Sequence, residues 1–299
     1  MTERPCPACA STNLRDRGAA GEYRWRQCAE CATASTDRLP TPGELAAFYA
    51  DYYEDASEAP EHVQRRLDEV IDGWAPHRAT GDVLDVGFGS GDLLRAAARH
   101  GWTCWGTELS EVAAEMGRGA GWTVITGDLL ATDLPAGHFD VVAMVEVLEH
   151  LPDPAAYLVR AIGLLRPGGL LWGTTPNGGS LNHRLLGTRW PNVAPPEHLQ
   201  LFSPRGLREL LRATGFTTER VVSRGLNPSM LLARRRPSAG AAAPPVRAPI
   251  SSRELNAAVE RGAVGRAAKR TLNRLLGITG VGDSLELRAV RPHEPSGRP

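Results

Sequence analysis

Residues 82–94 read DVLDVGFGSGDLL, and this stretch decides the fold. A short apolar run leads into three glycines within residues 87–91, and an apolar pattern with helical spacing follows from Leu93. Strand, glycine turn and helix in this order are typical of the nucleotide-binding crevice of an open parallel sheet. Glycines let a ligand approach the backbone there, because they lack a Cβ and adopt positive φ at little cost. A tight strand-to-helix turn without a ligand would have the same sequence pattern.

The composition is that of an ordinary globular protein. The chain has 299 residues, of which 42% are hydrophobic and 23% charged, enough for one large or two modest domains. Its formal net charge is zero, so we expect no general attraction to nucleic acid or to a membrane surface. Residues 229–299 carry 13 Lys+Arg against 5 Asp+Glu, which fits a solvated basic face or a site for a polyanion.

Targeting signals are absent from the sequence pattern. The first 30 residues lack the apolar core of a signal peptide, and no apolar run approaches the ~18 residues of a membrane-spanning helix. We therefore expect a cytoplasmic protein that does not enter a membrane. In a reducing cytoplasm, cysteines stay available as thiols.

Two CxxC pairs near the amino terminus predict a structural zinc site. Cys6 and Cys9 are separated from Cys28 and Cys31 by 18 residues, and this spacing lets four thiolates reach one tetrahedral Zn²⁺. Four thiolates fill the coordination shell, so the ion would be structural and not catalytic. Residues 1–37 can bury little core, so metal ligation would hold this zinc-ribbon-like module together. A pair of disulfides is the alternative, which a reducing compartment disfavours.

Beyond the glycine loop, strand patterns alternate with helical ones, which predicts a parallel sheet. The expected strands after the first are 102–107, 122–127, 139–145, 170–175 and 217–223. Asp153 followed by Pro154 marks a helix start, with Asp as N-cap and Pro at the first helical position. Glu108 follows the second strand, about 20 residues beyond the glycine loop, where a carboxylate can accept hydrogen bonds from both hydroxyls of a ribose.

Taken together, these motifs resemble those of a class I S-adenosylmethionine-dependent methyltransferase. They occur in the order VLDVGFGSG, GTELS, TGDLL, FDVVAMVEVLEHLPDP, LLRPGGLL and TPN, and the resemblance is close over residues 81–216. It implies an α/β fold with a doubly wound, Rossmann-like sheet of seven mostly parallel strands, whose final strand at 284–290 is antiparallel. A small amino-terminal zinc ribbon would precede this sheet, and S-adenosyl-L-methionine would be the co-substrate.

The resemblance also implies which residues bind the cofactor. The positions carried over from the family are Asp85, Gly87, Gly89, Gly91, Glu108, Leu109, Asp128, Leu129 and Glu146. The glycines would face the methionine and ribose portions, and Glu108 would hold the ribose hydroxyls. Asp128 would accept from the adenine amino group with Leu129 against the ring, and Glu146 would lie near the methionine end. Without a cofactor, Asp128 would be a helix N-cap and Glu108 a surface carboxylate.

Residues 146–150 form an ExxEH run whose acidic and imidazole side chains share one face if the turn is helical. With His198 from the later PPEHL segment, Glu146, Glu149 and His150 could bind a divalent cation. Ubiquinone-pathway O-methyltransferases and small-RNA 2′-O-methyltransferases have a similar run. Many family members without a metal also look similar there; in them the Glu lies beside the cofactor and the His fixes a loop.

Residues 177–204 connect the fifth strand to the next helix without a clear periodicity. A connection of this length in a compact domain is expected to have a function, here as part of the acceptor pocket. His198 is the preferred general base, because the ordinary pKa of histidine lies near neutrality. His150 and Glu146 complete the candidate catalytic set, and His183 is weaker because we expect it at the surface. Alternatively, His198 only anchors its loop.

The remaining segments lie before, between and after the parts of the sequence that we expect to form the core. Residues 38–78 are expected to form a linker and lid helices, and residues 79–228 together with 283–291 the methyltransferase core. Residues 229–282 would be a basic helical insertion with an Ala/Pro-rich linker, and residues 292–299 a disordered tail. The insertion could cap the acceptor site, or contact a carrier or a second copy of the chain in a homodimer.

We therefore expect a zinc-ribbon-bearing methyltransferase that acts on a small-molecule acceptor, a hydroxyl of a sugar or another secondary metabolite. Metal-assisted RNA 2′-O-methylation is an alternative, disfavoured by the neutral net charge. Sugar C-methylation is a second, weakened because the chain lacks room for a full second carboxy-terminal domain. A non-catalytic, zinc-dependent partner-binding protein is a third, against which the intact glycine loop argues. A NAD-linked dehydrogenase is disfavoured because the loop lacks the third fingerprint glycine or alanine.

Overall fold

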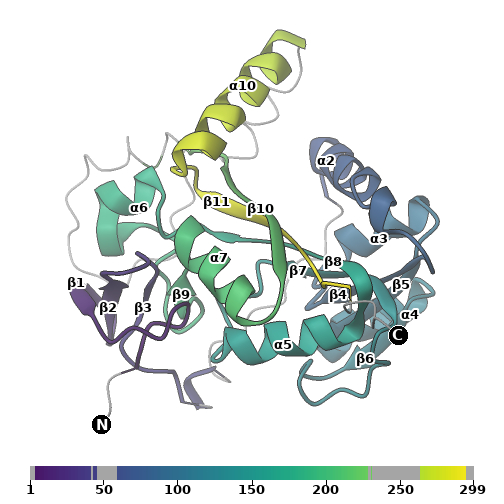
Figure 1. Ribbon diagram of the computed structural model, residues 1–299, viewed down its shortest axis with the longest axis horizontal. Helices are drawn as coiled ribbons and strands as arrows, with labels where there is room; N and C mark the ends of the chain where they lie inside the picture. Colours follow the sequence, from purple (N-terminus) through teal and green to yellow (C-terminus); the bar gives the residue numbers. More distant parts are fainter. Residues whose placement is uncertain (1–3, 42, 46–58, 228–229, 231–262, 294–299) are drawn as a thin grey trace, which may run out of the picture.

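The protein, as a computed structural model, consists of a seven-stranded central sheet flanked by helices and a four-stranded sheet at the amino-terminal end (Figure 1). The structure describes residues 4–41, 43–45, 59–227, 230 and 263–293. The central sheet contains β4 (Asp82–Val86), β5 (Thr103–Glu108), β6 (Thr123–Thr126), β7 (Phe139–Val145), β8 (Leu165–Pro176), β10 (Thr217–Arg224) and β11 (Ser284–Val290).

The strand order of the central sheet is β10-β11-β8-β7-β4-β5-β6. The five strands from β8 to β6 are parallel to their neighbours, and β11 runs antiparallel to both β8 and β10. Connections run in opposite directions from β4, and right-handed crossovers therefore place helices on both faces. This confirms the doubly wound α/β fold with an antiparallel final strand.

Helices connect and cover the strands. They are α2 (Glu61–Asp72), α3 (Asp92–Arg99), α4 (Glu111–Gly119), α5 (Pro154–Leu164), α6 (Leu181–Leu186), α7 (Pro204–Ala213) and α10 (Ala263–Thr279), with short 3-10 helices η1 (Ala75–His77) and η2 (Gly187–Arg189). Side chains cap four of these helices, because Ser110, Asp153, Ser180 and Ser203 each accept a hydrogen bond from a backbone N–H of the first turn. The helix start expected at Asp153-Pro154 is confirmed.

The apolar core lies on both sides of the central sheet. One cluster, which includes Leu84, Val142 and Leu158, packs towards α5 and α7, and the other, which includes Val83 and Val141, packs towards α2 and α3. Successive residues of one strand therefore enter opposite clusters, as expected for a strand buried on both faces. Within the described residues, the helices are too short or too polar to cross a bilayer.

The smaller sheet has the order β1-β2-β3-β9 and is antiparallel throughout. Its strands are β1 (Leu14–Ala20), β2 (Tyr23–Cys28), β3 (Ala34–Thr36) and β9 (Gln200–Leu201). The first two form the hairpin between the CxxC pairs. The fourth comes from the long connection after β8, so this connection contributes to the amino-terminal sheet.

Several sequence expectations concern segments that are only partly described. Of the expected lid region at 38–78, residues 42 and 46–58 lie outside the described residues. Of the expected insertion, only Met230 and the part from residue 263 onwards are described, and the latter contains the helix α10. The expected disordered tail lies outside the described residues from 294 onwards. The domain boundaries therefore stay a prediction.

Candidate active site

A cleft of about 880 Å³ opens where the parallel strands β4, β5, β6 and β7 end. Eight of the expected site residues line it: Gly87, Gly89, Glu108, Leu109, Asp128, Leu129, Glu146 and His150. These residues come from four separate loops, which the parallel sheet brings together because the carboxyl ends of its strands share one edge. Other lining residues, which no sequence motif marks, include Val112, Met116, Val147, Leu151 and Tyr157.

Glu108 joins the glycine loop to the start of α4. Its Oε2 accepts a hydrogen bond from the backbone N–H of Gly89 at 2.9 Å, and its Oε1 accepts from Leu109 at 2.8 Å and Ser110 at 3.1 Å. The side chain is buried, so the alternative of a surface carboxylate is wrong. A carboxylate held in place by three backbone donors is preorganised to accept further hydrogen bonds from a ligand.

Gly91 and Asp85 support the cleft without lining it. Gly91 has φ +74°, and a Cβ there would lie 2.5 Å from the ring of Trp122, so both backbone conformation and packing require glycine. Asp85 is buried on β4, where burial and the nearby Glu108 raise the pKa of its carboxyl well above the ordinary range. The structure therefore places these two expected residues beneath the cleft surface.

Asp128 and Tyr157 form a hydrogen-bonded pair in the cleft wall. The Tyr157 hydroxyl donates to Oδ2 of Asp128, while Oδ1 accepts from the backbone N–H of Leu130 at 2.7 Å. Asp128 thus closes a turn after β6 and caps no helix, which removes the N-cap alternative. Burial, followed by the hydrogen bond to Asp128, raises the pKa of Tyr157 above its ordinary value, so Tyr157 remains the donor.

Glu146 begins the turn that follows β7, and its backbone is strained. Its φ of +52° lies in the left-handed region, which non-glycine residues rarely adopt, while its backbone N–H donates to the Thr174 carbonyl at 2.9 Å. Strained residues of this kind cluster at functional sites. We refer to residues 146–151 as the ExxEH turn.

Glu149, His150 and His198 lie together at the end of the ExxEH turn. One ligand atom from each lies within 4.8 Å of the others, and the two imidazole rings have centroids 4.9 Å apart. Glu149 is completely buried; its Oε2 accepts from Thr175 at 2.9 Å, whereas its Oε1 has no hydrogen-bond partner among the described residues. Burial and the neighbouring Glu146 raise the pKa of Glu149 well above its ordinary range.

Each of the two histidines has one ring nitrogen engaged by a backbone carbonyl. His150 Nδ1 lies 3.0 Å from the Glu197 carbonyl, and His198 Nδ1 lies 2.8 Å from that of Asn192. Because a carbonyl only accepts, Nδ1 carries the hydrogen in each ring and Nε2 has a lone pair in the neutral form. Burial, followed by the nearby His198, lowers the pKa of His150.

The connection at 177–204 contributes to the cleft only indirectly. None of the cleft-lining residues comes from this segment, and His198 is linked to the cleft through its contact with His150. The expectation that His183 lies at the surface is wrong, because His183 is buried and its Nδ1 donates to the Gly178 carbonyl at 2.6 Å. No local pattern marks this burial; the imidazole lies beside the ring of Trp190, with the ring centroids 5.5 Å apart.

The four amino-terminal cysteines gather at one point. Their sulfur atoms lie within 4.8 Å of one another, with Sγ pairs at 3.5 Å (Cys6–Cys31) and 3.6 Å (Cys9–Cys28). A tetrahedral zinc with bonds of about 2.3 Å separates its sulfur ligands by about 3.8 Å, so the spacing fits such an ion. We refer to the described residues 4–36 as the four-cysteine module.

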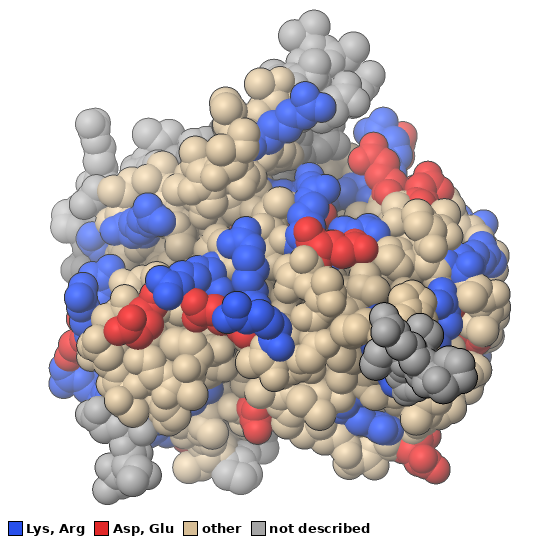
Figure 2. Space-filling model, viewed as in Figure 1, with Lys and Arg blue, Asp and Glu red and all other residues tan. Residues whose placement is uncertain are grey.

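A second hollow of about 420 Å³ lies between α2 and the β8-β11-β10 part of the central sheet. Its charged side chains are largely paired: Arg224 contacts Glu286 at 2.8 Å and Arg288 contacts Glu219 at 3.4 Å. Figure 2 shows basic and acidic side chains interspersed over the face of the molecule that it presents. This hollow therefore lacks the single-sign charge of a polyanion site.

Comparison with known proteins shows the family to which the chain belongs. A family model described as a methyltransferase domain matches residues 59–221, more than half of the chain and all four loops of the cleft. The chain belongs to this methyltransferase family. The expectation of an S-adenosylmethionine-dependent methyltransferase is thereby confirmed, with S-adenosylmethionine as the co-substrate.

Relatives of the methyltransferase are found among curated proteins and solved structures. A ubiquinone biosynthesis O-methyltransferase of Thiobacillus denitrificans is 32% identical over 160 residues, which are 49% of this chain and 68% of that protein. Phosphoethanolamine N-methyltransferase 2 of Haemonchus contortus, solved with S-adenosyl-L-methionine, has a TM-score of 0.52 at 18% identity, covering 87% of this chain and 63% of that one. A SAM-dependent methyltransferase from Archaeoglobus fulgidus has a TM-score of 0.51 at 17% identity, covering 76% and 94%. At such identities, the structural likeness shows the fold alone.

Proposed function

We propose that the methyltransferase transfers a methyl group from S-adenosylmethionine to a hydroxyl of a small molecule, such as a sugar or another secondary metabolite. Two relatives at 32% and 30% identity, both named ubiquinone biosynthesis O-methyltransferases, support O-methylation. The observation that carries the proposal is the preorganised Glu108 carboxylate at the mouth of the glycine loop, because it is suited to hold a ribose.

The cofactor would lie along the strand edge. Glu108 would accept from the ribose hydroxyls beside Gly87 and Gly89, and Asp128 would accept from the adenine amino group, with Leu129 against the ring. The sulfonium activates its own methyl group, so the protein must mainly hold the acceptor in line with the C–S bond and remove a proton. Glu146, at the methionine end, would help to orient the acceptor.

The cofactor assignment is tested by binding of S-adenosylhomocysteine, measured by isothermal titration calorimetry. We expect Glu108→Ala to weaken binding roughly tenfold or more, because the variant loses charge-assisted hydrogen bonds to the ribose. Glu111→Ala is the matched control, since Glu111 lies only three residues away but is engaged by Arg118 at 2.8 Å on the exposed side of α4. Equal affinity of wild type and Glu108→Ala would contradict the ribose assignment.

His150 and His198 are the proposed proton acceptors. The sequence favours His198, but His150 is the ring that lines the cleft, so we place His150 at the acceptor and His198 beside it. Replacing a general base lowers turnover by about 10²–10⁴-fold.

A screen of catechol, a phenolic glycoside, a nucleotide-linked sugar and an RNA oligonucleotide, read by mass spectrometry, identifies the acceptor class. Product NMR then separates O- from C-methylation.

A divalent cation at Glu149, His150 and His198 is a second proposal, favoured by the buried Oε1 of Glu149, which has no hydrogen-bond partner among the described residues and lies 3.9 Å from His150 Nε2. A carboxylate oxygen and two imidazole nitrogens suit a transition-metal ion or Zn²⁺. Glu146, which the sequence also suggests as a ligand, does not belong to this cluster. Mn²⁺ binding followed by electron paramagnetic resonance should be lost in Glu149→Ala. Methyl transfer that survives both EDTA and Glu149→Ala would exclude this proposal and with it metal-assisted RNA methylation.

A structural zinc ion in the four-cysteine module is a third proposal. The hydrogen bond shared with Cys6 lowers the pKa of Cys31 below its ordinary value, which favours one thiolate already without a metal. We expect one zinc per chain by elemental analysis of protein purified without chelator. Cys9→Ser should lose this zinc, while Cys104→Ser, which changes a buried cysteine of β5, should retain it. Retention of zinc by Cys9→Ser would refute the assignment.

A carrier or homodimer contact through residues 229–282 and a cytoplasmic location stay predictions. The methyltransferase domain matched over residues 59–221 argues against the non-catalytic partner-binding alternative.

A further inference from the structure

The four-cysteine module and the ExxEH turn are joined through one short segment of backbone. On one side, β9 pairs with β3, and the N–H of Thr36 donates to the Leu199 carbonyl at 2.9 Å; Figure 1 shows the two strands next to each other. On the other side, the N–H of Leu199 donates to the Glu149 carbonyl at 2.8 Å, and that of Gln200 donates to the same carbonyl at 3.3 Å. Residues 199–201 therefore lie between the module and the turn.

The side chain of Gln200 makes the same connection a second time. It is completely buried, and its Nε2 donates to the carbonyls of Leu148 and Leu151, each at 2.8 Å. Its Oε1 accepts from Arg4 at 2.8 Å, and Arg4 stands two residues before Cys6. One carboxamide thus binds the carbonyls on either side of Glu149 and His150 and ties the ExxEH turn to the module. A primary amide is the side chain that offers two donors and an acceptor from one planar group.

We propose that Gln200 is a positioning residue through which the four-cysteine module holds the ExxEH turn, and with it His150, at the acceptor side of the cleft. The inference rests on the proposed function only in assigning His150 to the acceptor. The proposed ribose side is held separately, because the backbone N–H of Gly89 donates to Glu108 directly at 2.9 Å. Loss of the module should therefore loosen the acceptor side and leave the contact of Glu108 with the glycine loop in place.

Hydrogen exchange followed by mass spectrometry tests this link in the full-length protein. In Gln200→Met and Gln200→Glu, which lack the two donors, exchange in peptides covering residues 146–151 and 197–201 should accelerate roughly tenfold. Peptides covering 103–108, in the central strand β5, should be unchanged. Arg4→Met should accelerate exchange at the same two places to a smaller degree, and Arg4→Lys should restore protection because it keeps a donor near Gln200.

Non-additivity separates a positioning role from general stabilisation. Cys9→Ser should accelerate exchange in the same two peptides, and combining it with Gln200→Met should add little, because both changes act through one link. A cysteine variant is preferred to a chelator, which would also strip a cation from Glu149. S-adenosylhomocysteine affinity should fall less in Gln200→Met than in Glu108→Ala, because the contact of Glu108 with Gly89 is untouched.

Three results would overturn the inference: unchanged exchange in both Gln200 variants, equal acceleration in the 103–108 peptide, or fully additive effects of Cys9→Ser and Gln200→Met. If Cys9→Ser does not fold, the Gln200 and Arg4 variants decide alone. Failure of wild-type protein to bind S-adenosylhomocysteine would instead refute the proposed function, so the two failures are distinguishable.

Discussion

Tyr157 shows how a single side chain shapes the wall of the cleft. Its hydroxyl donates to Oδ2 of Asp128 from α5, an element that carries none of the expected site residues. A carboxylate oxygen has two lone pairs, so Oδ2 can keep Tyr157 and still accept from an adenine amino group. Tyr157 would then orient the acceptor atom for the adenine.

We expect Tyr157→Phe to weaken S-adenosylhomocysteine binding about threefold, because Asp128 loses the hydroxyl that fixes its carboxylate. Titration calorimetry at neutral pH measures this effect, with Glu111→Ala as the unchanged reference. Tighter binding by Tyr157→Phe would show that Tyr157 competes with the adenine for Asp128, which is the opposite of an orienting role.

The cleft residues fall into two groups: those that a local sequence pattern predicts and those that it does not. Glu108 and the loop glycines could be predicted because strand end, glycine turn and acidic residue have fixed spacings along the sequence. Tyr157 could not, because it reaches Asp128 across 29 residues from a helix whose sequence only predicts apolar packing. His150 ranked below His198 for a similar reason: which ring faces the cleft depends on how β9 packs against the ExxEH turn.

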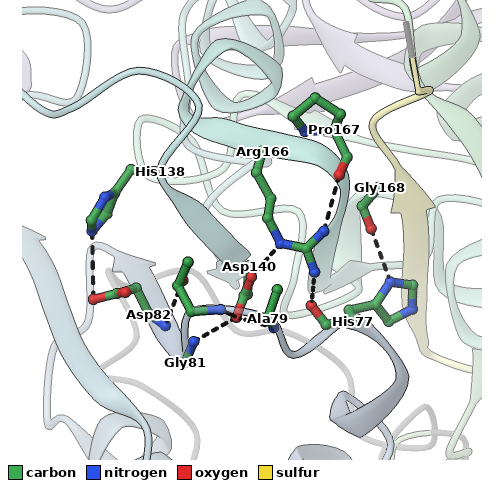
Figure 3. A network of polar contacts seen from close by, with 10 residues as sticks. His77, Ala79, Gly81, Asp82, His138, Asp140, Arg166, Pro167 and Gly168 are labelled. Carbon is green, nitrogen blue, oxygen red and sulfur yellow. Dashed lines mark hydrogen bonds and ion pairs between the residues drawn. The ribbon is translucent and has the colours of Figure 1, made fainter. Parts of the chain in front are cut away.

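At the level of elements, the strand ends opposite the cleft are held together by one buried carboxylate (Figure 3). Asp140 on β7 accepts from the backbone N–H groups of Ala79, Thr80 and Gly81 at 2.7, 2.9 and 2.7 Å, and from Nε of Arg166. Burial alone would raise the pKa of Asp140, but Arg166 and the backbone donors outweigh it and hold that pKa below the ordinary value.

We expect Asp140→Asn to lower the free energy of unfolding by roughly 3 kcal/mol, because it leaves Arg166 partly buried without its charge partner. Denaturant unfolding at pH 7 measures this, with Asp133→Asn as a control that changes the same charge on the exposed surface. S-adenosylhomocysteine binding by the folded variant should be unchanged, since Asp140 lies at the opposite strand ends. A loss no greater than that of Asp133→Asn would contradict this account.

The contribution of Asp140 to the free energy of unfolding should decrease as the pH falls. A carboxyl whose pKa is depressed on folding stabilises the protein above its unfolded pKa, and this stabilisation is lost as pH falls through the folded pKa. The Asp140 contribution should therefore be complete at neutral pH and disappear on acidification below about pH 4. Unfolding curves of wild type and Asp140→Asn should converge in that range, and a constant difference down to pH 2 would argue against it.

The bounds of a strand can be predicted where a local sequence pattern sets them, but not where a contact with a distant part of the chain sets them. The strands expected at 139–145 and 284–290 are confirmed residue for residue, because each is a short run of strand-forming residues bounded by turn signals. The strand expected at 170–175 instead spans Leu165–Pro176. Its early part contains Pro167 and two glycines, which predict a turn, but Leu165 pairs with Phe139 and extends the ladder.

At the scale of the whole molecule, the four-cysteine module packs tightly on the start of α7. The Ser203 hydroxyl donates to the Cys31 carbonyl, and a Cβ built on Gly206 would lie 2.1 Å from Thr33 Oγ1 and 3.1 Å from Cys31 Sγ. No local sequence signal predicts this contact, because it joins residues about 170 positions apart. The sequence predicts the module and the core, but not how they meet.

We expect Gly206→Ala to destabilise the protein by about 1–3 kcal/mol, because the added methyl overpacks the contact with Thr33. Thermal unfolding measures the loss, and alkylation of Cys31 should become faster. Gly163→Ala is the matched control: Gly163 lies in α5 with open space around a Cβ, so alanine there should be neutral or slightly stabilising. Equal behaviour of the two variants would mean that the contact is loose.

The position of β9 also sets an order of events during synthesis. Thr36 leaves the ribosome 163 residues before its partner Leu199. At about 5–20 residues per second, the outer edge of β3 waits roughly ten to thirty seconds for its neighbouring strand. During that interval the backbone N–H and C=O groups at this edge of β3 are unpaired and can pair with other chains. Nascent chains that stall before residue 199 would expose this edge, so translation speed across the central sheet becomes a determinant of how much protein reaches the native state.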